Sequence, residues 1–297
     1  MNSNSKNKAY FALTTTSIIW GTTWVASRIG VEDVPGLQVS YLRQFIAGCL
    51  LLSFYFIRGE KLPTWQQFRW LFILSIFMFV LANGFSTWSV KYIPSGLASL
   101  ISALAPICVV LIDLAFFKQH KNTPLTFIGL FIGFAGVAMV FYENAFHKQP
   151  EGYMLGIIYG LIAMIAWSIG TIFLTRNKYN INPYYAMGWQ MFLSSFMIFI
   201  LAKLTRNDIP INEVSLKTWG AIAYLIIMGS VFAFAAFIYS IKYLPAAIAS
   251  LYAYINPIVA MLFGTLILDE PLTINLLFGA VVTLAGVYIV NYSVKKA

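Results

Sequence analysis

The chain has 297 residues, of which 60% are hydrophobic and only 10% are charged, and its mean hydropathy is +0.79. Soluble globular domains carry roughly a quarter charged residues, so this composition excludes an ordinary soluble domain and indicates a membrane protein. The net charge of +9 does not indicate nucleic-acid binding, because the basic residues are spread over many short segments instead of forming one long cluster.

Apolar runs follow one another from the first to the last part of the chain. A helix needs about 20 apolar residues to cross a hydrocarbon core about 30 Å thick, and the runs lack the alternating pattern of membrane strands. The sequence therefore predicts an all-α membrane protein with ten transmembrane helices. The predicted spans are 10–29, 36–57, 68–90, 94–117, 124–142, 152–174, 183–204, 218–241, 245–268 and 272–292.

The distribution of lysine and arginine predicts how the chain is oriented. If the N-terminus lies inside, the inner segments hold twelve basic residues and the outer segments hold six. Basic residues accumulate on the cytoplasmic side of membrane proteins, so both termini are expected in the cytoplasm. The first run follows Lys6 and Lys8 but is too long for the apolar core of a signal peptide and is not followed by a cleavage site, which predicts a retained helix.

An internal repeat divides the chain into two similar halves. The stretch "VKYIPSGLASLISALAPI" (90–107) matches "IKYLPAAIASLYAYINPI" (241–258) with an offset of 151, which aligns Pro106 with Pro257. Five helices per unit is an odd number, so the second unit enters the membrane from the other face and the repeats are inverted. The predicted units are a first repeat at 1–142, an external connecting loop at 143–151 and a second repeat at 152–297.

The quoted repeat, together with "IIWGTTWVASRIG" (18–30), Arg43 and "LDEPLTINLLFGAVVTLAGVYIV" (268–290), resembles the drug/metabolite transporter superfamily, EamA type. This resemblance implies ten helices in two five-helix units, residence in a bacterial inner membrane, and transport of metabolites, amino acids or drugs. The chain departs from the family pattern at one place. The acidic residue before the last helix of a unit is present as Glu270 in the second half, whereas the first half reads "FFKQHKNTP" (116–124).

Two prolines at matching positions predict the substrate site. Pro257 cannot donate a hydrogen bond to the carbonyl of Ala253, and Pro106 likewise frees the carbonyl of Ser102, so both helices should kink. Interrupted helices at corresponding positions of two repeats point to a binding site between them, and Asn256 adds an amide there. The alternative is that each proline makes only a packing kink.

Arg43 is the only charged residue well inside a predicted span apart from Asp113, which lies near the inner end of the fourth. Burying an arginine in a membrane helix costs about 2.5–3.5 kcal/mol on insertion scales, so Arg43 is expected to face the bundle interior. It would then bind a substrate carboxylate or phosphate. The alternatives are that it caps carbonyls of a kinked helix or extends to the outer surface.

Aromatic and amide side chains complete the predicted binding site. Trp20, Trp167, Tyr252 and Tyr254 are candidates for an aromatic pocket, although packing or membrane-interface positions are the ordinary use of such residues. Asn83 is a candidate for a polar path, because a buried amide is hard to satisfy.

Small residues predict one pair of packed helices outside the site. Gly129 and Gly133 form a GxxxG motif in the fifth span, and Gly279, Thr283 and Gly286 place small residues on the tenth. These two equivalent helices are expected to pack closely against each other as a scaffold.

Together these features predict a secondary transporter that exports or exchanges a small molecule by alternating access, as a single chain in the lipid bilayer. No nucleotide-binding loop, cofactor motif or catalytic constellation is evident, so neither a cofactor nor an enzymatic activity is expected. The remaining alternatives are a passive channel and, less favoured, a membrane-embedded enzyme. Proton exchange through a carboxylate of the first span has no support, because 10–29 contains no acidic residue.

Overall fold

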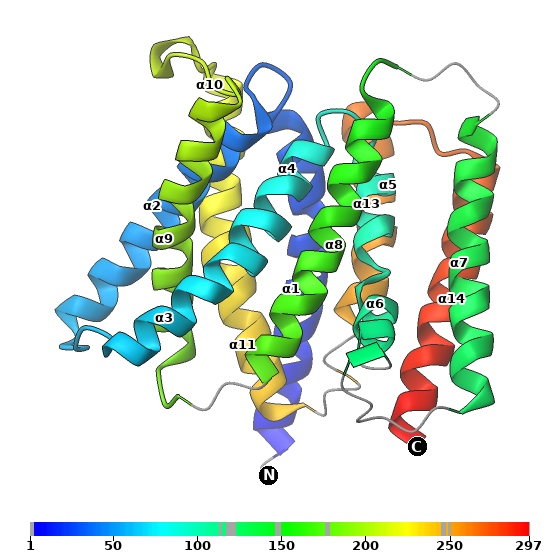
Figure 1. Cartoon of the computed structure of the whole chain (residues 1–297), viewed down its shortest axis with the longest axis horizontal. Helices are drawn as coiled ribbons and strands as arrows, with labels where there is room; N and C mark the ends of the chain where they lie inside the picture. Colours follow the sequence, from blue (N-terminus) through cyan, green and yellow to red (C-terminus); the bar gives the residue numbers. More distant parts are fainter. Residues whose placement is uncertain are drawn as a thin grey trace.

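The computed structural model is a bundle of membrane-crossing helices with both chain ends at the same face (Figure 1). It describes residues 3–112, 115–116, 123–145, 150–175, 179–244, 248 and 251–296. We call the face that holds the two ends the termini face and the other one the opposite face. Asp113, Pro245 and residues 146–149 of the predicted connecting loop lie outside the described residues.

The described helices of the first half account for the first five predicted spans. They are α1 (Ser3–Gly30), α2 (Gly36–Ile57), α3 (Trp65–Leu74) with η1 (Ser75–Gly84) and α4 (Phe85–Ser89), α5 (Ser95–Ser102) with α6 (Ala105–Ile112), and α7 (Pro124–Ala145). The third span is thus one long helix in three parts, and the fourth is broken between Ser102 and Ala105.

The second half repeats this plan. Its described helices are α8 (Tyr153–Thr175), α9 (Pro183–Leu204), the short η3 (Ile211–Glu213), α10 (Leu216–Tyr224) with η4 (Leu225–Phe232) and α11 (Ala233–Tyr243), α13 (Tyr252–Leu268), and α14 (Ile274–Lys296). The prediction of an all-helical fold of two five-helix units is confirmed. The ends of α2 and α9 coincide with the predicted limits 36–57 and 183–204.

Seven of the described helices are long and apolar enough to cross a membrane by length and composition, and 124–140 and 252–268 are shorter apolar stretches. The first helix is not among these because "TTTS" (14–17) lowers its hydropathy. Each of these four hydroxyls donates to the carbonyl four residues earlier, at 2.8–3.1 Å. These four residues therefore leave no hydroxyl proton unpaired in lipid.

Side-chain caps fix where several helices begin. Thr64 and Gln67 form a reciprocal capping box at α3, in which the Thr64 amide donates to Gln67 Oε1 at 2.8 Å. Asn182 Oδ1 accepts the amide of Tyr184 at 3.0 Å before Pro183 starts α9. These caps satisfy amides that have no partner inside their own helix.

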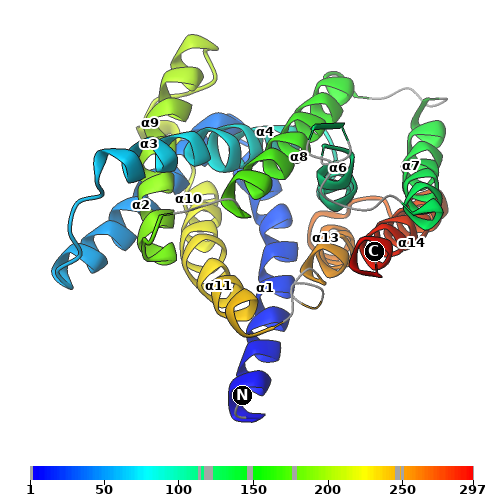
Figure 2. The ribbon, with the colours of Figure 1, turned by 60° about the horizontal axis from the view of Figure 1, so that its bottom comes forward.

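The two halves are interleaved. The first helix, α1, packs against α11 and α13 of the second half, and α8, its counterpart, packs against η1, α4, α5 and α6 of the first (Figure 2). The two counterparts run in opposite directions between the termini face and the opposite face (Figure 1). The repeats are therefore inverted, and neither half packs its own first helix mainly against its own helices.

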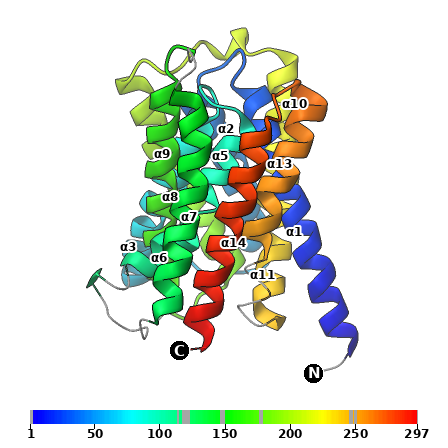
Figure 3. The ribbon, with the colours of Figure 1, turned by 90° about the vertical axis from the view of Figure 1, so that its right-hand side faces the viewer.

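The predicted scaffold pair is confirmed, since α7 and α14 lie side by side at one edge of the bundle (Figure 3). A Cβ atom added to Gly286 would stand 2.8 Å from the carbonyl oxygen of Gly129, and one added to Gly136 would stand 2.7 Å from that of Gly279. Only glycine permits so close an approach of the two backbones. Ser293 strengthens the pair through a hydroxyl contact of 2.7 Å with Thr126.

Candidate functional site

The third helix of each half contains a π-helical segment, η1 in the first and η4 in the second. Their first residues, Ser75 and Leu225, are separated by nearly the offset of the sequence repeat. Such wide turns are rare in proteins, and many of those that occur lie at functional sites. The composition of these apolar runs gave no signal for them, since the extra residue in a π turn needs no particular residue type.

Two adjacent residues of α2 bind these two segments. Arg43 Nε donates to the hydroxyl of Ser230 in η4 at 2.9 Å, and Gln44 Nε2 donates to Asn83 Oδ1 in η1 at 2.8 Å. Arg43 is only 5% exposed, so the alternative that it extends to the outer surface is wrong. The helix α2 thereby connects the third helix of its own half with the third helix of the other.

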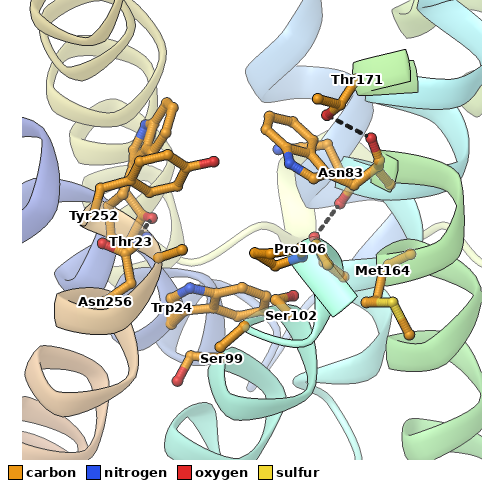
Figure 4. Close-up of a pocket in the computed structure, with 18 of the residues that line it drawn as sticks. Thr23, Trp24, Asn83, Ser99, Ser102, Pro106, Met164, Thr171, Tyr252 and Asn256 are labelled. Atoms are coloured by element: carbon orange, nitrogen blue, oxygen red, sulfur yellow. Dashed lines mark hydrogen bonds between the residues drawn. The ribbon is translucent and has the colours of Figure 1, made fainter. Parts of the chain in front are cut away.

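A cavity of about 390 Å³ lies among these elements, with residues of both halves around it. Figure 4 shows Thr23, Trp24, Tyr252 and Asn256 on one side of this space and Asn83 among the residues that face it from the other. Its lining draws on α1, α2, η1, α4, α5, α6 and α8, and on α11, α13 and α14 of the second half. This volume falls within the range of about 300–1,000 Å³ that is typical of small-molecule sites.

The structure brings eight of the ten predicted site residues to this one cavity. They are Trp20, Arg43, Asn83, Ser102, Pro106, Trp167, Tyr252 and Asn256. Tyr254 and Pro257 are not part of its lining. Pro257 is buried within α13, and the hydroxyl of Tyr254 accepts a hydrogen bond from Asn291 Nδ2.

The fourth span is interrupted beside Pro106. The amide of Ala103 still bonds to Ser99 at 3.0 Å, but the amide of Leu104 bonds to Ile101 at 3.1 Å, which is the tighter spacing of a turn. The predicted kink is present, and the missing N–H of Pro106 is one cause of it. The break in the helix is centred two residues before the proline. Ser102 and Pro106 both line the cavity at this break.

Asn256 connects α13 with α1. With its amide oriented to satisfy its neighbours, Nδ2 donates to the carbonyl of Ser17 at 2.8 Å and to that of Tyr252 at 3.0 Å. A Cβ atom added to Gly21 would stand 3.2 Å from the carbonyl of Asn256, so the two helices approach closely there. The amide therefore joins two helices at the edge of the cavity.

One wall of the cavity is aromatic. The ring of Trp20 lies 4.9 Å from that of Phe234, 5.0 Å from that of Phe237 and 5.2 Å from that of Tyr252, measured between centroids. Trp20 also donates from Nε1 to the carbonyl of Gly229 in η4 at 3.3 Å. Such edge contacts fix the indole, so it presents a rigid apolar surface to the cavity.

Several lining residues were not predicted from the sequence. They include Thr23, Met164, Phe234 and Asn291. Asn291 corrects the expectation that the tenth span serves only as a scaffold, because this residue of α14 reaches the cavity. An amide near the end of the apolar run 272–292 was the available signal. Phe234 has no such signal, since it is one phenylalanine among 25.

Polar contacts join the halves across the opposite face. Glu270, which follows α13, accepts hydrogen bonds from the amide and hydroxyl of Ser95 at the start of α5, and Lys217 pairs with Glu32. Within the first half, Arg28 donates to the carbonyls of Val90 and Lys91 on the same face. Every one of these contacts bridges different helices. Among the described residues, no cluster of histidine, cysteine, aspartate and glutamate is able to hold a metal ion.

Comparison with known proteins identifies the fold and the family. A crystal structure of another protein superposes with a TM-score of 0.66 at 16% identity, covering 100% of this chain and 99% of that one. The uncharacterized inner membrane transporter YedA of Escherichia coli (strain K12) is 31% identical over 86% of this chain and 81% of its own length.

The uncharacterized transporter YoaV of Bacillus subtilis (strain 168) is 24% identical over 97% of this chain and 98% of its own length. A family model described as the EamA-like transporter family matches residues 7–142 and again residues 154–292. The protein is therefore a membrane transporter and not an enzyme, and the chain belongs to the EamA-like transporter family.

Proposed function

We propose that the protein is a secondary carrier that exports or exchanges a small metabolite, an amino acid-like compound or a drug by alternating access. The observation that carries this proposal is a cavity of about 390 Å³ lined by residues of two inverted halves. A site at the interface of inverted repeats becomes accessible from each side in turn when the halves move against each other. In this proposal, 1–142 and 152–297 are the two repeat units, joined by an external loop at 143–151.

The proposed binding residues divide into polar and apolar groups. Asn83, Ser102 and Asn256 supply amides and a hydroxyl, while Trp20 and Tyr252 supply apolar surface. Small-molecule sites usually have a mostly apolar lining with a few polar groups at defined positions. Pro106 and the π segments supply the local bends that a rocking motion requires.

The contacts of the opposite face support two alternating states. Glu270 of the second half binds the Ser95 amide at the start of α5 in the first half, and Lys217 pairs with Glu32, so movement of the halves must release these bonds. We further propose that the protein resides in a bacterial inner membrane, with both termini in the cytoplasm, and that a single chain suffices for transport. The termini face is then the cytoplasmic one.

The test is counterflow in proteoliposomes that contain the purified full-length chain. A thermal-shift screen of metabolites first selects a solute that stabilises the protein. Uptake of labelled solute should then saturate and should rise when unlabelled solute is loaded inside. Flux that increases linearly with concentration and is indifferent to internal solute would establish a channel instead.

A further inference from the structure

The charge balance of the cavity indicates which substrates it accepts. Arg43 is the only charged residue of its lining among the described residues, and the same lining contains no aspartate, glutamate or lysine. Its guanidinium has five N–H donors, of which Nε donates to Ser230. No described carboxylate forms an ion pair with it. The cavity therefore has one buried positive charge with no negative partner.

A buried charge without a partner is stabilised when an opposite charge enters beside it. A carboxylate, phosphate or sulfonate matches the planar fork of a guanidinium and can accept two of its hydrogen bonds. The reverse holds for an ammonium group, which would be repelled by Arg43 and would find no carboxylate in the described lining. Electrostatics thus favours anions over cations and also over zwitterions.

The apolar part of the lining indicates the shape and polarity of the rest of such a substrate. Figure 4 shows the side chains of Tyr252 and Trp24 beside the same space, with Pro106 and Met164 facing it from the other side. Trp20 and Phe234 extend this apolar wall towards η4, the segment that Arg43 binds. A flat apolar ring would lie against these rings while its acidic group meets the guanidinium.

We infer that the cavity selects organic anions that join an acidic group to a flat apolar body, and that it discriminates against amines and zwitterions of the same shape. This inference rests on the proposed carrier function, because it assumes that the cavity is the transport site. Arg43 sets the specificity, and Ser230 holds it in place.

Four ligands of similar shape test the inference on the purified full-length chain in detergent. They are indole-3-acetate, the neutral indole-3-acetamide, the cation tryptamine and the zwitterion tryptophan. Benzoate, benzamide and benzylamine form a smaller second series. Binding is measured by calorimetry and by the shift in melting temperature. In at least one series the anion should bind more than tenfold tighter than its amide and its amine.

Two variants assign that preference to Arg43. Arg43→Gln should reduce the affinity for the anion to that for the amide while leaving the affinity for the amide unchanged. Arg58→Gln is the matched control, because Arg58 follows the same helix at an exposed position, over the ring of Phe54. It removes one positive charge and should leave the preference intact. Arg43→Lys keeps the charge and should retain part of the preference.

Equal affinity for the anion and the amine in the parental protein would overturn the inference, even if Arg43→Gln failed to fold. Absence of binding by either carboxylate would overturn it as well. Counterflow distinguishes the two proposals: saturable exchange of an amine or a zwitterion at the parental rate, with no preference for anions, refutes the selectivity and leaves the carrier function standing.

Discussion

Glu270 and Ser95 join the two halves of the protein at the opposite face: the carboxylate accepts the Ser95 amide at 2.8 Å through one oxygen and the Ser95 hydroxyl at 2.7 Å through the other. The acceptor follows α13 of the second half, and the donors open α5 of the first. Negative charge at the start of a helix is favourable, since the first amides there have no helical partner. Glu270, the acidic residue of the family pattern, therefore caps a helix of the other repeat.

The first prediction concerns this cap. Hydrogen bonds to a charged group contribute about 1.5–3 kcal/mol, so Glu270→Ala should lower the melting temperature by several degrees. Glu213→Ala is the control, because Glu213 is exposed on the short η3. Glu270→Gln keeps an acceptor and should fall between the two. An unchanged melting temperature for Glu270→Ala would contradict the capping role.

The second prediction concerns Asn256. Asn256→Leu removes the amide that contacts Ser17, and a polar contact between membrane helices contributes about 0.6 kcal/mol on average. The variant should fold, with a melting temperature close to that of the parent, yet lose most counterflow. Ser102→Ala should give a weaker defect of the same kind. Transport at the parental rate with unchanged apparent affinity would remove Asn256 from the proposed site.

The third prediction concerns the scaffold pair. Gly286→Ala would push a methyl group into the backbone of α7 near Gly129, so we expect a large loss of thermal stability or of folded protein. Gly220→Ala is the matched control, since a Cβ there meets no atom within 4 Å. Alanine also favours the helix, by about 0.8–1.0 kcal/mol. Melting curves of the two variants should therefore move in opposite directions.

The fourth prediction concerns orientation. A reporter fused after Ala297 should be active in the cytoplasm, and one inserted at Gln149 should be external, because an odd number of spans separates the two. Gln149 itself lies outside the described residues. An internal signal at Gln149 would contradict the proposed orientation, whatever the result at the C-terminus.

The sequence predicted the helices well where helix ends have a local cause. Pro35 precedes α2 and Pro183 opens α9, and both spans were predicted to the residue. The π segments were missed because a wider turn changes the register of side chains without changing composition. The break in the fourth span was predicted from Pro106, but its centre was not, since neighbouring helices determine which turn opens.

The candidate site was predicted mainly through repeat symmetry and through residues that are costly in lipid. Arg43 and Asn83 were selected because a charge or an amide needs a partner there, and both line the cavity. The partners themselves, Ser230 and Gln44, could not be predicted, because each contact joins different helices across a long sequence separation. Tyr254 was selected for its ring alone, and its hydroxyl pairs with Asn291.

The interleaving of the halves determines the order in which the protein can be assembled during synthesis. The first helix, α1, is made at the start, but its partner α13 begins only at residue 252. At roughly 5–20 residues per second, α1 waits on the order of 10–40 s in the bilayer before that partner is translated. The hydroxyls at 14–17, each bonded within its own helix, allow α1 to remain in lipid alone during this interval.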